Sequence, residues 1–313
     1  MDPSLTHRIS APASVVVVGS CNMDLVARVP RLPLPGETLT GTSFDTYLGG
    51  KGLNQAVAAR RMGASVAMVA RVGADDFGRR ITQALHDEGI DAAQVQSDDP
   101  QPTGTAVILV EESGENNIVV IPGANGALTT ADIDRAAEQI RSAGVLLLQL
   151  EVPLETTLHA AQLARAAGTT VILTPAPAQR LPSALFATTD VLVPNEVEVA
   201  QVLGTQARPS DAAQALLAQG CGAVVVTLGA QGALLVTAEG EQAIAPFAVT
   251  PVDTVGAGDA FVGALAAGLA KGQDLTIVLR YASAAGAIAT TRPGAMASLP
   301  SRDEIEQFLR AQE

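Results

Sequence analysis

The feature that most constrains the fold is an alternation of short, continuous apolar runs with longer helical stretches. The apolar runs, rich in Val, Ile and Leu, are Val15–Val18, Val66–Ala70, Val145–Leu150, Val171–Thr174, Val191–Val193 and Val224–Leu228. The amphipathic stretches among them include Asn54–Met62, Gly78–Glu88, Thr130–Ser142 and Leu154–Ala167. Strands that are apolar on both faces and separated by helices are typical of βαβ units. The pattern therefore predicts an α/β fold in which helices cover both faces of a mostly parallel sheet.

Two segments depart from this rhythm, Thr38–Tyr47 and Thr105–Val120, which are richer in Thr and Gly. A turn signal at residues 112–115 divides the second segment into a hairpin. Strands without helices between them predict a small sheet outside the main one, placed as a lid. Because no internal repeat or flexible linker interrupts the chain, we treat residues 1–313 as one domain, with lid strands from about 38–47 and 105–120 inserted in it.

The composition excludes several classes of function. The chain has 19 basic and 32 acidic residues, a formal net charge of −13, which disfavours a nucleic acid or an anionic membrane as partner. An anionic small molecule stays compatible, because one focused site can oppose the overall field. Two cysteines, Cys21 and Cys221, and three scattered histidines make a disulfide framework or a Cys/His metal cluster improbable.

The chain carries no targeting or membrane signal that we recognise. Residues 1–14 include an acid and a proline but no apolar centre, so they do not resemble a signal peptide. The longest uncharged apolar stretch, Ala260–Ala270, is shorter than the ~20 residues that a membrane span needs. We therefore expect a soluble, cytoplasmic protein.

The sharpest local signal is DTVGAGDAF at residues 253–261, which continues into the apolar helical stretch Phe261–Leu269. Small residues before a helix leave backbone N–H groups free, and the helix start adds partial positive charge, so this loop is a candidate anion site. Asp259 would face the bound anion, although an ordinary capped turn fits the same residues. Neither lysine of the chain lies in a P-loop pattern, and a dinucleotide fingerprint is absent. A nucleotide must therefore be held in another way.

The N-terminal half contains a second constellation of polar residues. GSCNMD (residues 19–24) follows the first predicted strand, and GGKGLNQ (residues 49–55) leads into a helix. Asn22 and Asp24 at a strand end are able to point together into the crevice above the sheet, where amide and carboxylate groups suit hydroxyls. The two glycines before Lys51 allow a ligand close to the backbone. An Asx-turn followed by a helix start is the alternative.

Taken together, GSCNMD, GGKGLNQAVAARRMGA and DTVGAGDAF resemble, in order and spacing, the ribokinase / phosphofructokinase-B family of carbohydrate kinases. The resemblance extends from Val15 to Leu309. It implies an α/β, ribokinase-like three-layer sandwich with a mostly parallel central sheet and a small β-sheet lid. Four further segments, LLQLEVP, LTPAPA, VPNEVE and TLGAQGA, are most similar to the family members that phosphorylate ribose.

The resemblance implies a role for each matching residue. Asp259 would be the general base that takes the proton from a sugar hydroxyl, and the backbone of Gly256, Ala257 and Gly258 would bind the transferring phosphoryl group. The residues placed against the sugar, besides Asp259, are Asn22, Asp24, Gly50, Lys51, Asn54 and Glu151. Glu151 also has a local rationale, because it follows a predicted strand at the carboxyl edge of the sheet; a solvated loop acid is the alternative.

The NEVE segment matches the family's NxxE pattern. The resemblance places Asn195 near the nucleotide phosphates and Glu198 beside hydrated Mg²⁺, acting through water. From the residues alone, the segment is a helix start. The other positions matched to the nucleotide are Thr227, Gly229, Gly232, Gly258 and Ser283, the last on the adenine side, where relatives often carry a larger polar residue.

Family members use a monovalent cation, usually K⁺, beside the anion site. The matching positions, several acting through backbone carbonyls, are Asp253, Val255, Ala289, Arg292, Gly294 and Ser298. Asp253 and Ser298 keep side-chain oxygens, which favours a working site. Pro293 and Met296 are local departures that change the loop without removing these ligands.

The function implied is ATP-dependent phosphorylation of D-ribose at the 5-hydroxyl, with ATP, Mg²⁺ and K⁺. Alternatives are a kinase for another furanose (deoxyribose, a nucleoside or fructose) or a sugar sensor without catalysis. The polar set around Lys51 suits a small polyol better than a nucleobase, and the intact Asp259 opposes the sensor. We also expect a homodimer through an outer apolar face of the lid that carries Phe44, Tyr47, Val107 and Leu109, because such a face needs cover.

Overall fold

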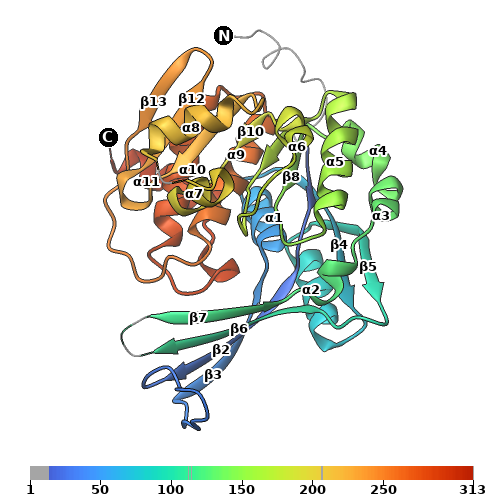
Figure 1. The fold of residues 1–313 in the computed structure, drawn as a ribbon, viewed down its shortest axis with the longest axis vertical. Coiled ribbons are helices and arrows are strands. Elements are labelled where there is room, and N and C mark those ends of the chain that lie inside the picture. The colour runs from blue at the N-terminus through green and yellow to red at the C-terminus, as the bar shows by residue number, and fades with distance from the viewer. Residues whose placement is uncertain (1–13, 112, 114, 206, 313) are drawn as a thin grey trace.

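A computed structural model describes residues 14–312, apart from residues 112, 114 and 206. The N-terminal segment interpreted above lies outside the described residues, as do two residues of the predicted hairpin turn, Glu112 and Gly114. A large sheet with helices on both sides forms the body of the molecule, and a smaller sheet projects from one end of it (Figure 1). The predicted architecture is thereby confirmed.

The large sheet has nine strands in the order β13-β12-β11-β10-β9-β8-β1-β4-β5. Its strands are β1 (Ser14–Val18), β4 (Ser65–Gly73), β5 (Asp91–Asp98), β8 (Val145–Leu148), β9 (Thr170–Leu173), β10 (Val191–Leu192), β11 (Ala223–Thr227), β12 (Ala233–Thr237) and β13 (Gly240–Ile244). All neighbours pair in parallel except β11–β12 and β12–β13, which are antiparallel. The core of the sheet is therefore parallel, as the continuous apolar runs predict.

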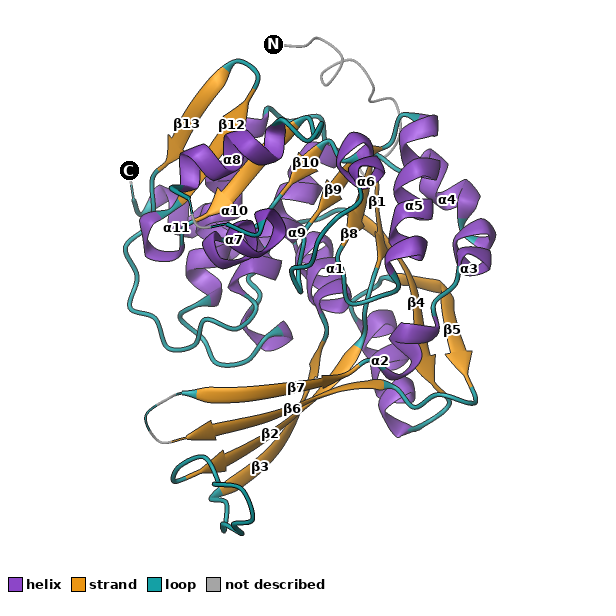
Figure 2. Ribbon diagram, viewed as in Figure 1, coloured by secondary structure: helices purple, strands orange, loops and turns teal. Residues whose placement is uncertain are grey.

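Helices cover both faces of this sheet (Figure 2). One face is packed by α1 (Lys51–Arg61), α2 (Asp76–Asp87), α9 (Ala257–Ala270), α10 (Leu275–Ala289) and α11 (Arg302–Arg310). The other is packed by α3 (Thr130–Arg135), α4 (Ala137–Ser142), α5 (Leu154–Ala167), α6 (Ser183–Thr188), α7 (Glu196–Leu203) and α8 (Pro209–Leu217). Val15 and Val17 of β1 belong to the first core, and Val16 and Val18 to the second. This alternation explains why the strand has no polar face.

The small sheet has the order β3-β2-β6-β7. Its strands are β2 (Asn22–Val29), β3 (Ser43–Gly49), β6 (Gly104–Glu111) and β7 (Asn116–Ile121). The sequence predicts three of these strands, with β3 starting too early, but names no strand at β2. Polar residues such as Asp24 and Arg28 interrupt the apolar residues of β2, so the strand has no long continuous apolar run. Most of its residues are half-buried or exposed, which is why polar side chains are tolerated there.

The register of the small sheet corrects one expectation about its faces. Tyr47 pairs with Asp24 across β2 and β3, while Phe44 pairs with Ala27. Residues an odd number of positions apart on a strand point to opposite faces. Tyr47 therefore lies on the face that carries Asp24, and only Phe44, Val107 and Leu109 share the other face.

Three strands of the large sheet, β5, β12 and β13, are likewise not among the predicted strands. Other differences concern the ends of elements. The predicted helix Thr130–Ser142 is two short helices that meet at Ala136, and β8 ends at Leu148, before the polar Gln149. Within the part of the chain that the structure describes, no helix combines the length and apolarity needed to cross a bilayer.

Two features of the fold create the site. The strand order changes direction at β1, which lies between β4 and β8, and such switch points leave a crevice at the carboxyl ends of the strands. Next to it, α1 and α9 pack unusually closely, because a Cβ atom at Gly263 would lie 2.4 Å from the Cβ of Ala58. Asp259, one turn before Gly263, is thereby drawn against the first turn of α1.

Candidate functional site

The centre of the site is the Asp259 carboxylate, in the first turn of α9. Its two oxygens accept one hydrogen bond each: Asn54 Nδ2 donates to Oδ2 at 2.9 Å, and Gln55 Nε2 donates to Oδ1 at 3.0 Å. All three side chains are buried, and both donors lie in the first turn of α1. Each carboxylate oxygen keeps a lone pair after these bonds, so the group remains able to accept a proton.

Opposing effects determine the protonation of Asp259. Burial raises its pKa, while the positive charge of Lys51 and the two amide donors lower it, and the charge of Glu151 raises it. The net direction is upward. A raised pKa makes the ionised carboxylate a better proton acceptor, and burial beside a positive charge is typical of functional carboxyls.

A chain of buried amides supports this carboxylate from below. Gln149 Nε2 donates to Gln55 Oε1 at 2.6 Å, which leaves Gln55 Nε2 to donate to Asp259. The two glutamines are fully buried. Neither is among the residues predicted from sequence, although Gln149 has a detectable signal: it is a polar residue within the otherwise apolar run Val145–Leu150.

The start of α9 has the geometry that the predicted anion site requires. Gly256 has φ 80° and precedes the helix in the left-handed region, which favours glycine. In the described chain, the amides of Gly258 and Asp259 have no acceptor, whereas Ala257 N donates to Thr254 O. A Cβ atom at Gly258 would meet nothing within 4 Å. The helix start therefore has two unpaired amides and open space beside Gly258, as an anion cradle requires.

Asn22 and Asp24 begin β2 and share one face of the small sheet. Asn22 is buried, and Asn125 Nδ2 donates to its Oδ1 at 2.7 Å. Burial and the charges of Glu151 and Asp259 raise the pKa of Asp24 to about 6. Because the charges of Glu151 and Asp259 act on Asp24, its carboxylate belongs to the site centred on Asp259. The register places Tyr47 and Ala106 on the two strands that flank Asp24, so both side chains adjoin it on the same face.

Glu151 lies after β8, at the carboxyl edge of the sheet. Its Oε2 accepts hydrogen bonds from the hydroxyl of Ser20 and from Lys51 N, the latter at 3.1 Å. Gly52 N in turn donates to Ser20 Oγ at 3.3 Å. The alternative of a solvated loop acid is excluded, because Glu151 joins the β1 loop to the start of α1. Ser20 is, after Gln55 and Gln149, a third site residue that sequence patterns do not single out.

The glycines before α1 permit this close approach. Gly50 has φ 92°, and a Cβ atom there would lie 2.7 Å from Asn22 N. Lys51 follows, and the charges of Asp259, Glu151 and Glu198 raise its pKa despite its burial. Lys51 is therefore a cation that faces carboxylates from three separate elements.

Asn195 and Glu198 form the start of α7 as the residues alone predict. Glu198 N donates to Asn195 Oδ1 at 2.8 Å, and Asn195 N donates to Glu198 Oε2 at 2.9 Å, which is a capping box. Burial raises the pKa of Glu198, and Asp259 contributes to the rise. The cap uses one oxygen of Glu198 and leaves Oε1 free.

Three of the remaining nucleotide positions, Thr227, Gly229 and Gly232, lie around the end of β11. Thr227 forms an isolated parallel β-bridge with Asn195 through the backbone. Gly229 has φ 53°, and a Cβ atom there would meet nothing within 4 Å. Gly232, by contrast, is required by the fold, since a Cβ atom there would lie 2.1 Å from Ile244 O. Ser283 Oγ is buried on α10 without a partner in the described chain.

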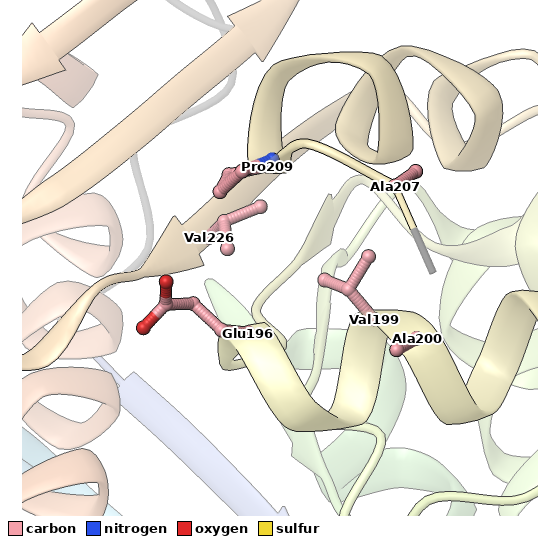
Figure 3. A pocket seen from close by; sticks show the side chains of 6 residues that line it. All are labelled: Glu196, Val199, Ala200, Ala207, Pro209 and Val226. Carbon is pink, nitrogen blue, oxygen red and sulfur yellow. The ribbon is translucent and has the colours of Figure 1, made fainter. Parts of the chain in front are cut away.

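A separate cavity of about 150 Å³ lies between α7, α8 and β11, with the Glu196 carboxylate at one end (Figure 3). Apolar side chains, such as Val199 and Val226, line the rest of it. None of the predicted site residues lines this cavity, so it is distinct from the site centred on Asp259.

The residues matched to a cation also come together. Asp253 Oδ1 accepts from Val255 N at 3.0 Å, and its Oδ2 accepts from Gly294 N at 2.9 Å. Arg292 N donates to Ala289 O at 3.3 Å. The Arg292 side chain forms an ion pair with Glu304 of α11 and is not a candidate ligand of the cation. The fully buried Ser298 donates from Oγ to Ala295 O at 2.8 Å. The two loops that carry these oxygens meet next to the start of α9, where a Cβ atom at Gly256 would lie 3.1 Å from Ala295 O.

Comparison with known proteins agrees with this geometry. A family model described as pfkB family carbohydrate kinase matches residues 12–302. The ribokinase of Haemophilus influenzae is 38% identical over 300 residues, 95% of this chain and 98% of the relative. The deoxyribokinase of Salmonella typhi is 36% identical over 304 residues, 96% of this chain and 99% of the relative. The solved structure of Arabidopsis thaliana ribokinase complexed with ribose and ATP superimposes with a TM-score of 0.90 at 33% identity, over 96% of this chain and 99% of that one. The chain therefore belongs to the pfkB family of carbohydrate kinases.

Proposed function

We propose that this protein transfers the γ-phosphoryl group of ATP to the 5-hydroxyl of D-ribose. One observation carries the chemistry: a buried carboxylate, Asp259, lies at the helix start whose free amides form an anion cradle. Phosphoryl transfer to an alcohol needs positioning, a proton acceptor and charge stabilisation, and this arrangement supplies all three. The choice of ribose is supported by relatives such as the Haemophilus influenzae and Arabidopsis ribokinases.

The proposed reaction follows from the residues in place. Asn22, Asp24, Lys51, Asn54 and Glu151 orient the sugar. The Asp259 carboxylate accepts the 5-hydroxyl proton as that oxygen forms a bond to the γ-phosphorus, and the bond from phosphorus to the bridging oxygen of ADP breaks. The amides of Gly258 and Asp259, with Gly256 and Ala257 shaping the turn, stabilise the charge on the transferring group. The small sheet would cover the sugar on the side of Asp24.

The residues present fit the two metal ions that the resemblance implies. Glu198 keeps one oxygen outside its capping box and would hold Mg²⁺ through water, which would neutralise phosphate charge. The oxygens of Asp253 and Ser298, with nearby carbonyls, are the ligand type that K⁺ takes, and K⁺ there would add positive charge next to the cradle. Val255, Ala289, Arg292 and Gly294 would contribute carbonyls. Asn195, Thr227, Gly229, Gly232 and Ser283 would surround the nucleotide.

A kinase for deoxyribose is the second candidate, because the Salmonella typhi deoxyribokinase is similar over nearly its whole length. The test is kcat/KM with MgATP and KCl for ribose, 2-deoxyribose, fructose and nucleosides. We expect ribose to be preferred, since a site built to hydrogen-bond a hydroxyl discriminates strongly against the analogue without it. A higher kcat/KM for 2-deoxyribose would establish the second candidate instead.

Sugar binding should depend on the ionisation of Asp24. Its pKa is raised to about 6, so the carboxylate is charged above that pH and accepts a sugar hydroxyl, but is progressively protonated below it. We expect the Kd for ribose to rise as the pH falls through about 6. Calorimetry in an Asp259→Asn background removes the titration of Asp259, although it also removes one of the charges that raise the pKa of Asp24, so the step should move to lower pH. Glu198, whose pKa is also raised, still titrates in this background. Adding Asp24→Asn should abolish the rise of the Kd at low pH. If the protein that retains Asp24 shows a Kd independent of pH, Asp24 does not control sugar binding by its ionisation.

We also propose a cytoplasmic homodimer that pairs through the small sheet. Phe44 and Val119, which share the face opposite Asp24, are 64% and 61% exposed. An apolar sheet face of this kind needs a partner to avoid aggregation. Val119→Lys should convert the dimer into a monomer in light scattering. The matched control is Ile277→Lys on α10, a similarly exposed residue that should leave the dimer intact. A monomeric wild-type protein would overturn the proposal.

A further inference from the structure

We infer that Asn125 is a positioning residue that determines which end of the Asn22 side chain faces the sugar, and that it thereby makes Asn22 a hydrogen-bond donor to the substrate. Asn125 lies in the short helical turn η1 (Gly123–Ala127), which follows β7 and approaches the loop after β1. The inference rests on the proposed function, because it assumes that the ligand beside Asn22 is a sugar.

The orientation of Asn125 is set by the protein backbone. Cys21 N donates to Asn125 Oδ1 at 2.9 Å, so the atom at this position must be the oxygen. The other end of the amide must then be Nδ2, and it donates to Cys21 O at 3.2 Å. Because a backbone N–H and a backbone C=O are both satisfied in one orientation only, Asn125 has no alternative arrangement.

This fixed amide determines the orientation of Asn22 in turn. Asn125 Nδ2 also donates to the atom of Asn22 at 2.7 Å, which must therefore be the acceptor Oδ1. Asn22 Nδ2 has no acceptor among the described residues, so it is the end that remains for a ligand. The backbone of Cys21 therefore fixes the orientation of Asn125, and Asn125 fixes the orientation of Asn22, so that Asn22 Nδ2 is the donor at the site.

The donor lies next to an acceptor. Asp24 follows Asn22 by two positions on β2 and presents its carboxylate on the same face. The pair therefore offers an N–H group and a carboxylate side by side. This polarity fits two hydroxyls on neighbouring carbons, one accepting from Asn22 and the other donating to Asp24.

The packing around the contact holds the two side chains against each other. A Cβ atom at Gly104, the first residue of β6, would lie 2.1 Å from Asn125 Nδ2 and 2.4 Å from Asn22 Oδ1. Asn125 and Asn22 are 1% and 3% exposed, so water does not compensate for a lost bond. Turning either amide around would leave a buried polar group without a hydrogen bond, which is unfavourable.

The test is Asn125→Asp, a change of nearly equal shape. The new carboxylate still accepts from Cys21 N but has no N–H for Asn22 Oδ1 or for Cys21 O. We expect Asn22 to turn its amide, donate to the carboxylate and present its oxygen to the sugar. The KM for ribose should then rise about tenfold or more, while the KM for ATP stays unchanged. A merely structural role would instead alter both constants or only the melting temperature.

A second variant probes the same contact without adding charge. Gly104→Ala pushes directly on Asn125 Nδ2 and Asn22 Oδ1, so we expect the KM for ribose to rise again without a change for ATP. The matched control is Gly126→Ala in the same turn, where a Cβ atom would meet only Pro122 Cβ, at 3.4 Å. This control should behave as the wild type, and it separates the contact from the stability of the turn.

A double-mutant comparison shows whether Asn125 acts through Asn22. In an Asn22→Ala background, Asn125→Asp should change the KM for ribose no further, because the side chain that it orients is gone. If the wild type phosphorylates ribose but both Asn125→Asp and Gly104→Ala keep its KM, the inference is wrong and the proposed function stands. A wild type without activity on ribose overturns the proposed function and this inference with it.

Discussion

Asp259→Asn should lower kcat by roughly 10²–10⁴-fold or more, the range expected for loss of a general base, while the Kd for ribose stays measurable. The amide keeps the shape of the carboxylate but cannot take the hydroxyl proton. It also places an NH₂ group against one of two donors, Asn54 Nδ2 or Gln55 Nε2, which forces one of these amides to turn. Stopped-time assays for the rate and calorimetry for ribose binding separate the two effects.

The matched control for this variant is Asp274→Asn at the start of α10. Asp274 also lies at a helix start, where its carboxylate accepts from Thr276 N at 2.9 Å, but it lies on another helix and has no contact with Asn54 or Gln55. Asn is an equally good N-cap residue, so the control should keep full activity. Near-native turnover of Asp259→Asn would show that another group takes the proton.

Asp253→Ala should remove activation by K⁺ and lower kcat by roughly 10²-fold, similar to the loss of one donor from an anion hole. The Asp253 carboxylate joins Val255 N to Gly294 N and so ties together the two loops next to the cradle. Its loss removes both a proposed ligand and this tie. Because the cation would act on the transition state, kcat should fall more than the KM for ribose rises.

The measurement compares kcat in KCl, NaCl and tetramethylammonium chloride at equal ionic strength, so that screening is constant. We expect the wild type to be fastest in KCl. Arg292→Ala is the control, because the Arg292 side chain pairs with Glu304 and only its carbonyl is assigned to the cation. That variant should keep the preference for K⁺. Equal rates of the wild type in all three salts would show that the chain does not use the ion.

The parallel sheet is predictable from sequence because each central strand is buried on both faces and therefore reads as a continuous apolar run. The same criterion fails for β2 and β5, which carry polar residues such as Asp24 and Gln94. It also fails at strand ends: Gln149 and Leu150 extend the run of β8, yet the strand stops at Leu148, where the chain turns into the site. The sequence of an apolar run alone does not show at which residue the strand stops pairing with its neighbours.

Residues of the site are predictable where a motif marks them, and the others depend on tertiary packing. Glycines and a carboxylate before a helix already indicate the cradle and Asp259. Gln55 and Asn125, in contrast, act through bonds to residues 204 and 104 positions away in the chain, which no spacing rule encodes. Arg292 shows the converse: its position matches the family, yet its side chain serves an ion pair with Glu304.

The most direct test of the account is phosphorus NMR of the product formed from MgATP and D-ribose. Transfer to the 5-hydroxyl yields a phosphate ester on a methylene carbon, whose phosphorus signal is split into a triplet by the two attached-carbon protons. We predict this triplet with the wild type and its loss with Asp259→Asn. A doublet, which would come from an ester on a carbon bearing a single proton, or the absence of any new ester would contradict the assignment of this site as a ribose 5-kinase.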